Sequence, residues 1–170
     1  FNTYTGTYKG VEATVTSTGI GSPSAAIAME EMYESGMQVA VRMGTVMSMQ
    51  DDMLGHFMIP IAAMRREGTS QSYVDLSYPA VADVELVNVM NETVQQMGKR
   101  YLNGLNCTMD GFYSCMHDSK FSLECGRDMS KTFEEVKKLG VTGIDMESSC
   151  ILTLGRLMGV KTCILTVVTV

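Results

Sequence analysis

The sequence predicts a single α/β domain in which a mixed, mainly parallel sheet is flanked by helices. The first observation is that strand-like runs alternate with helical segments along the chain, an order typical of βαβ units. The second is that a glycine follows each of four helical segments, where it can adopt the left-handed conformation at little cost. The third is the length of 170 residues, which is enough for one substantial core.

The first half of the chain supplies two helices and the strands beside them. A strand over residues 11–16 leads into a helix over 25–35, and a glycine separates that helix from a strand over 38–43. Asp83 has the side chain of a good N-cap. It begins a helix whose apolar residues recur at helical spacing up to Gly98.

The second half repeats the pattern. Residues 100–109 favour a strand, and Ser130 is the expected N-cap of the next helix. A strand over 141–144, a helix over 146–158 and a strand over 160–170 complete the series.

Composition excludes several classes of function. The chain carries 13 basic and 19 acidic side chains, so it offers no positive field for nucleic acid or an anionic membrane. The five cysteines include no C-x-x-C pair, which favours reduced thiols in a cytoplasmic protein. With only two histidines in addition, we expect no metal site. The chain starts without methionine and stops within an apolar run, so we expect residues 1–170 to be one domain with residues missing at both ends.

Two candidate motifs lie in the first quarter of the chain, after predicted strands, where α/β proteins bind ligands. Residues 17–24 (STGIGSPS) place glycines at the start of a helix, where backbone N–H groups favour an anion. The same pattern also fits a tight strand-to-helix turn. Arg42 and Thr45 stand at the expected end of the next strand. An arginine there needs an anionic partner, which is either a phosphate or a carboxylate of the chain itself.

Two further motifs follow later strands. Asp145 and Glu147 lie where a strand meets a helix, so they are either helix caps or acceptors for vicinal sugar hydroxyls. Phe112 and Tyr113 follow the strand over 100–109 and either stack on a planar ligand or belong to the core.

Taken in order, these motifs resemble those of the nucleoside phosphorylase family of the trimeric or hexameric type, and most closely the uridine phosphorylases. The residues that carry the resemblance are STGIGSPS at 17–24, RMGT at 42–45, YPAVAD at 78–83, FY at 112–113 and MES at 146–148. The resemblance covers the whole chain. It implies a three-layer α/β sandwich and the reversible, phosphate-dependent cleavage of a nucleoside to a free base and ribose 1-phosphate, a step of pyrimidine salvage.

The resemblance also implies roles for individual residues. Arg42 and Thr45 are expected to bind phosphate and to act in catalysis. Thr45, Met146 and Glu147 are expected against the ribose, where Glu147 accepts the sugar hydroxyls. Phe112 is expected beside the base. Inorganic phosphate is the expected co-substrate, with no other cofactor.

The segment expected to recognise the base departs from the family pattern. Met116 and Asp118 stand where uridine phosphorylases carry a glutamine and an arginine that recognise uracil. We therefore expect these two residues at the base, with a weakened or altered specificity. A rearranged loop could bring His117 or Lys120 to the base instead.

Three functions stay open. The first is a uridine phosphorylase-like enzyme that acts as a homodimer. The second is a relative that cleaves another nucleoside or uses water in place of phosphate. The third is a catalytically impaired homologue that forms a heterodimer with an active paralogue. The features that support the third reading are Met116, Asp118, Val46 and Met47, of which the last two are bulky where the family carries small residues.

Overall fold

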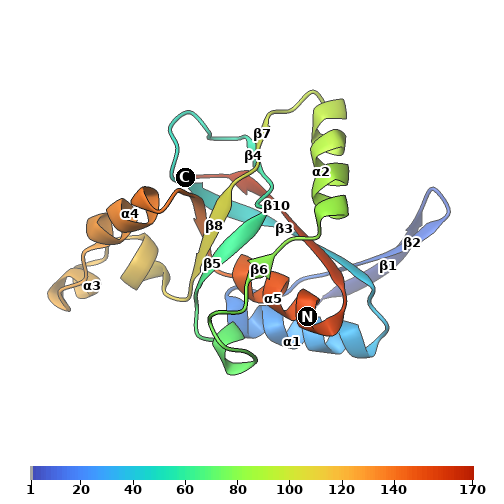
Figure 1. The fold of residues 1–170 in the computed structure, drawn as a ribbon, viewed down its shortest axis with the longest axis horizontal. Helices are drawn as coiled ribbons and strands as arrows, with labels where there is room; N and C mark the ends of the chain where they lie inside the picture. Colours follow the sequence, from blue (N-terminus) through green and yellow to red (C-terminus); the bar gives the residue numbers. More distant parts are fainter. Residues whose placement is uncertain (1) are drawn as a thin grey trace.

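The computed structural model describes residues 2–170, which form an eight-stranded mixed sheet with helices around it (Figure 1). The strands of this sheet are β3 (Val39–Ser48), β4 (Phe57–Met58), β5 (Ala62–Arg66), β6 (Ala80–Val81), β7 (Tyr101–Leu102), β8 (Leu105–Met109), β9 (Val141–Asp145) and β10 (Lys161–Val168). Their order is β6-β5-β8-β9-β3-β10-β4-β7. Four of the seven neighbouring pairs are parallel, which confirms the predicted fold class.

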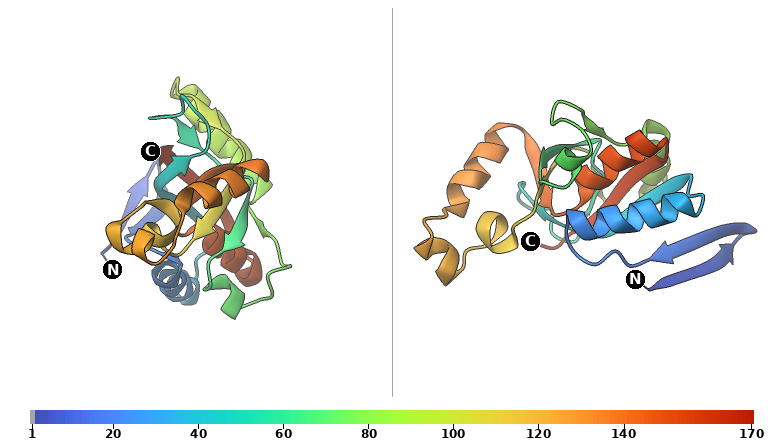
Figure 2. Two further views of the ribbon diagram at one scale, coloured as in Figure 1. Left: turned by 90° about the vertical axis from the view of Figure 1, so that its left-hand side faces the viewer. Right: turned by 90° about the horizontal axis from the view of Figure 1, so that it is seen from below.

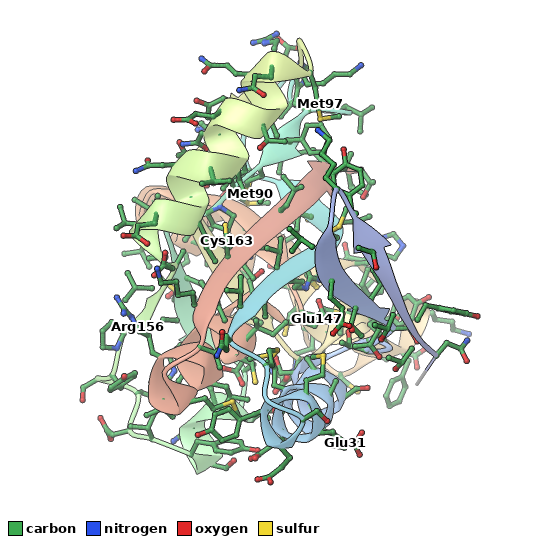
Figure 3. All side chains as sticks on the ribbon, turned by 90° about the vertical axis from the view of Figure 1, so that its right-hand side faces the viewer. Glu31, Met90, Met97, Glu147, Arg156 and Cys163 are labelled. Atoms are coloured by element: carbon green, nitrogen blue, oxygen red, sulfur yellow. The ribbon has the colours of Figure 1, made fainter. Side chains whose placement is uncertain are left out.

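Helices flank this sheet. They are α1 (Ser22–Glu34), α2 (Val84–Gln96), α3 (Lys120–Glu124), α4 (Met129–Lys138) and α5 (Ser148–Met158), with single turns at η1 (Ser70–Ser72) and η2 (Phe112–Met116). Helices α1 and α5 pack against each other, and α5 also covers β5, β6, β8 and β10. Helix α2 packs over β7 and β10, where Met90 lies beside Cys163 (Figure 3). None of the helices within residues 2–170 is both long enough and apolar enough to cross a membrane.

The predicted N-cap at Asp83 and the predicted helix stops are confirmed, whereas the N-cap expected at Ser130 is wrong. The Asp83 carboxylate accepts hydrogen bonds from the second and third N–H groups of α2, both at 3.1 Å. Gly159 ends α5 with a left-handed φ of 70°. Helix α4 begins one residue before Ser130, and its N-cap is Asp128, whose carboxylate accepts the Ser130 N–H at 3.1 Å.

Two predicted strands have different bounds in the structure. The strand expected over 38–43 continues to Ser48, because β10 pairs with β3 in parallel from Val39 to Val46. The strand expected over 100–109 divides into β7 and β8. These two strands pair with different neighbours, β7 with β4 and β8 with β5 and β9.

A separate antiparallel hairpin precedes the sheet. It is formed by β1 (Thr3–Tyr8), which we did not predict, and β2 (Val11–Thr16). Threonine pairs cross one of its faces, with hydroxyl oxygens 2.6 Å apart for Thr3 and Thr16. The hairpin projects from one side of the molecule and α3 and α4 from the other (Figure 2).

The structure predicts two classes of cysteine. Burial raises the pKa of Cys107 and Cys150 to about 12 and that of Cys163 to about 11, so these thiols stay protonated and shielded at neutral pH. Cys125 is exposed and Cys115 is half-buried. Titration of the folded protein with a thiol-specific chromogenic disulfide is expected to label Cys125 first and Cys115 more slowly. The other three thiols should react only after denaturation, and rapid labelling of all five would contradict this assignment.

Candidate active site

An ion pair between Arg42 of β3 and Glu147 unites two of the predicted motifs. Arg42 Nη2 donates to Glu147 Oε2, and Arg42 Nη1 lies 3.3 Å from Asp145 Oδ2. The side chains of Asp145 and Glu147 are only 2% and 7% exposed, and that of Arg42 is 14% exposed. One cation therefore faces two carboxylates in a largely water-free setting. Removing one member of such a group is costly, because it leaves a buried charge uncompensated.

The two acids at the start of α5 differ in their contacts. Asp145 acts as the helix cap, since both of its carboxylate oxygens lie 3.3 Å from the Ser148 N–H and Oδ2 also accepts the Ser148 hydroxyl. Glu147 occupies the N-cap position, but its side chain makes no capping hydrogen bond. Its carboxylate is thereby left for Arg42 and for the Gly21 N–H.

The glycine-rich turn before α1 holds the other side of Glu147. The Gly21 N–H donates to Glu147 Oε1 at 2.6 Å, and the Ser22 hydroxyl donates to the Met146 carbonyl at 2.8 Å. Gly21 has a φ of 88°, which a residue with a Cβ adopts only under strain. The predicted anion at this turn is thus a carboxylate of the chain itself, and Figure 3 shows Glu147 between β3 and α1.

Gly44 provides the space in which the Arg42 side chain lies. A Cβ at Gly44 would be 2.7 Å from Arg42 Nη1 and 2.9 Å from Arg42 Cζ. Residues two apart share a face of a strand, so the guanidinium folds back over the glycine. Sequence reasoning missed this role, although the arginine–x–glycine spacing carries the signal.

Thr45 does not share the face of Arg42. Residues three apart on a strand point to opposite faces, and Thr45 is exposed on the side away from the ion pair. Arg42 also does not stand at the end of its strand as expected, because β3 continues for six further residues to Ser48. The structure therefore brings Arg42 and Glu147 together, and leaves Thr45 apart from them.

Burial raises the pKa of the Asp145 carboxyl above its ordinary value, because desolvation disfavours the charged form. The positive charge of Arg42 is the largest influence in the opposite direction, followed by the hydrogen bond from the Ser148 hydroxyl. The ionised form of Asp145 thus depends on Arg42 and on the donors around it.

The aromatic motif follows β8, which neighbours β9. Phe112 is 43% exposed, and its ring lies 5.1 Å from that of Tyr113 and 5.7 Å from that of His117, measured between centroids. Lys120 points to solvent, with 93% of its side chain exposed. Between the two candidate replacements for the base contacts, the structure places His117 and not Lys120 next to Phe112.

Of three other residues that the sequence analysis named, two are buried in core clusters and one is exposed. Met116 is 4% exposed and packs in a core cluster with Val136 and Ile144, against which Met146 also lies half-buried. Asp118 is exposed. Val46 is buried against a separate cluster, so its bulk belongs to the core.

Arg42 Nη1 is buried and has no hydrogen-bond partner among residues 2–170. Its approach to Asp145 is an ion pair without hydrogen-bond geometry. A buried donor left without an acceptor costs about 1–3 kcal/mol, so the site favours a ligand that brings an acceptor oxygen. The part of the chain that the structure describes contains no cluster of His, Cys, Asp or Glu suited to a metal ion.

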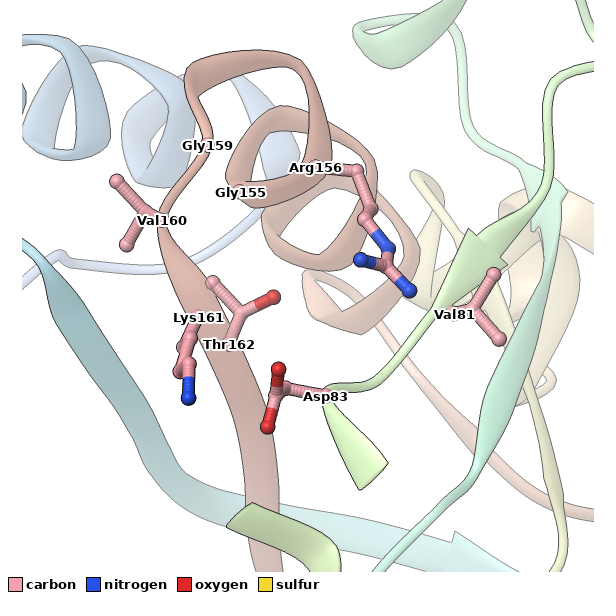
Figure 4. Close-up of a pocket in the computed structure, with 8 residues that line it drawn as sticks. All are labelled: Val81, Asp83, Gly155, Arg156, Gly159, Val160, Lys161 and Thr162. Carbon is pink, nitrogen blue, oxygen red and sulfur yellow. The ribbon is translucent and has the colours of Figure 1, made fainter. Parts of the chain in front are cut away.

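A separate hollow lies at the other end of α5 (Figure 4). It is lined by Val81, Asp83, Gly155, Arg156, Gly159, Val160, Lys161 and Thr162. An α-helix of the length of α5 spans roughly 16 Å, so this hollow is not part of the site around Glu147.

Comparison with known proteins gives matches along nearly the whole chain. A family model described as the phosphorylase superfamily matches residues 1–169. A uridine phosphorylase from Thermococcus kodakarensis is 36% identical over 162 residues, which are 95% of this chain and 58% of that protein. A guanosine phosphorylase from Halorubrum lacusprofundi is 29% identical over 155 residues, 91% of this chain and 59% of that protein.

A solved structure is also similar. The crystal structure of a uridine phosphorylase from Vibrio fischeri ES114 superposes with a TM-score of 0.87 at 31% identity, and the match covers 99% of this chain and 66% of that one. The chain thus spans less than two thirds of the length of the two curated relatives, 58% and 59%.

Proposed function

Because the chain belongs to the phosphorylase superfamily, we propose that the protein is a nucleoside phosphorylase that transfers ribose from a base to phosphate. In this reaction a phosphate oxygen forms a bond to the anomeric carbon of ribose, and the bond from that carbon to the base breaks. The sugar becomes cationic and the base anionic as the bond loosens. The site must therefore hold phosphate next to the ribose and stabilise the departing base.

One observation carries this proposal: Arg42 Nη1 is buried without a hydrogen-bond partner among the described residues, while Nη2 of the same guanidinium is paired with Glu147. In this proposal a phosphate oxygen accepts a hydrogen bond from Arg42 Nη1, which has no such partner among the described residues. Glu147 keeps Oε1 on the Gly21 N–H, so Oε2 is the oxygen that can exchange Arg42 for ribose hydroxyls. Arginine suits this task because its planar fork of donors matches both carboxylate and phosphate.

The remaining contacts are part of the same proposal. Met146 adjoins Glu147 and is proposed to lie against the ribose, and Phe112 is proposed beside the base. Thr45 is proposed as a second ligand of phosphate and ribose, although it lies on the face of β3 opposite Arg42 in this structure. A dimeric assembly, with itself or with a paralogue, and a cytoplasmic location stay predictions.

The specificity for the base is proposed to be pyrimidine, with a purine nucleoside as the alternative because a guanosine phosphorylase is among the relatives. The burial of Met116 and the exposure of Asp118 favour the reading of an impaired homologue as a second candidate. Neither residue offers a buried donor for a uracil oxygen.

The experiment is to measure base release from uridine and from guanosine by the full-length protein, with and without inorganic phosphate. Phosphate-dependent release of one base is the expected result, and the preferred nucleoside identifies the specificity. Equal release without phosphate would overturn the phosphorylase assignment in favour of a hydrolase. If neither base is released, the impaired homologue is supported, and co-purification of a second family member would identify its partner.

A further inference from the structure

A series of buried polar contacts runs from Arg42 into the protein interior. Asp145 Oδ2 faces Arg42, and Asp145 Oδ1 accepts a hydrogen bond from Thr108 Oγ1 at 2.9 Å. Thr108 Oγ1 in turn accepts the Ser149 N–H at 2.8 Å. Thr108 is fully buried on β8, opposite Asp145 in the register of β8 and β9. The same threonine therefore contacts both the acid behind Arg42 and the first turn of α5.

The direction of these hydrogen bonds follows from the groups involved. A backbone N–H can only donate, so Ser149 occupies a lone pair of the Thr108 hydroxyl. An ionised carboxylate can only accept, so the single hydroxyl proton of Thr108 points at Asp145. This arrangement fixes the plane of the Asp145 carboxylate and favours its charged form against the effect of burial.

We propose that Thr108 is a positioning residue for phosphate: it orients Asp145, which holds the Arg42 guanidinium in place for the ligand. The inference rests on the proposed function, in which Arg42 binds phosphate. Gly44 lies under the guanidinium, with Asp145 and Glu147 beside it, so these three residues define its place on β3. Without the Thr108 hydroxyl, Asp145 keeps only the donors of Ser148, so its carboxylate is held less firmly toward Arg42.

The matched variants are Thr108→Val, Thr108→Ser and Thr153→Val. Valine removes the hydroxyl of Thr108 at nearly the same volume, whereas serine keeps it. Thr153 is the control because it is also fully buried, lies in α5, and has a hydroxyl without a hydrogen-bond partner among the described residues. A general effect of a buried threonine-to-valine change would therefore appear in T153V as well.

The experiment is calorimetric titration of the full-length protein with inorganic phosphate, together with KM for phosphate and for the cleaved nucleoside. A hydrogen bond to a charged group is worth about 1.5–3 kcal/mol, so T108V is expected to weaken phosphate binding by about tenfold to a hundredfold. KM for the nucleoside should change by less than about twofold, and T108S and T153V should bind phosphate like the unaltered protein.

The results separate this inference from the function on which it rests. Unchanged phosphate binding by T108V would overturn the inference alone, as would an equal rise in both KM values or an equal loss in T153V. If the unaltered protein binds no phosphate and needs none for base release, the proposed function fails, and the role of Thr108 fails with it.

Discussion

Replacing Arg42 with methionine is expected to lower both the stability of the protein and its phosphate-dependent activity. The substitution leaves Asp145 and Glu147 buried without their shared cation, and breaking a buried ion pair in this way costs about 3–5 kcal/mol. The loss of a preorganised group that stabilises charge lowers the rate by on the order of 10²–10³. The two effects are measured by urea denaturation and by base release at saturating phosphate, at a temperature where the variant stays folded.

Arg42→Lys is the matched variant for this prediction. Lysine keeps the positive charge, so most of the stability should return, but one ammonium group cannot bridge two carboxylates with a planar fork. We therefore expect weak phosphate binding in the lysine variant despite a nearly restored midpoint of unfolding. A methionine variant with unchanged stability and an unchanged KM for phosphate would show that Arg42 is neither a structural cation nor a phosphate ligand.

Replacing Gly155 with alanine is expected to destabilise the protein although alanine is the better helix former. Propensity alone would stabilise α5 by about 1 kcal/mol. A Cβ at Gly155, however, would lie 2.6 Å from Thr162 Oγ1 and 3.0 Å from Thr162 Cβ, with Thr162 Cγ2 closer still. Overpacking of this kind costs typically about 1–3 kcal/mol and sometimes more. Thr162 is buried on β10, so the helix has to move away from the sheet.

The loss of stability caused by Gly155→Ala is measured by urea denaturation of single and double variants. Thr162→Ala in the Gly155→Ala background should recover part of the loss, since it removes the two branches that approach the new Cβ most closely. Gly6→Ala is the control, because a Cβ at Gly6 would meet no atom within 4 Å and should change stability by less than about 0.5 kcal/mol. Additive effects of the two changes at Gly155 and Thr162 would contradict the proposed contact.

Local signals predicted much of the fold, because they act between residues close in the chain. Asp83 caps α2 through N–H groups two and three residues away, and Gly159 ends α5 by its own left-handed backbone. Local signals failed where two candidates stood side by side or where a neighbouring strand decided the outcome. Asp128 caps α4 in place of Ser130, and β3 extends to Ser48 because β10 pairs along it.

The candidate site was likewise predicted only in part from local signals. The motifs named Arg42 and Glu147 from residue type and order, and the structure brings the two together. The sequence left open whether Asp145 and Glu147 are helix caps or acceptors for sugar hydroxyls, and it contained no local sign that Thr108 matters for Arg42. The burial of Met116 could not be predicted from the sequence either, since it depends on the packing of η2 against α4 and β9.

This sequence determines three properties by itself. They are the alternation of strands and helices, the residues at which helices end, and an acidic composition with only two histidines. The tertiary structure decided which polar atoms meet. Arg42 and Glu147 are 105 residues apart, Gly21 and Glu147 are 126 apart, and Thr108 and Asp145 are 37 apart. Such pairs form only when β3, β8 and β9 lie in one sheet and α1 packs on α5, because no local spacing brings their side chains into contact.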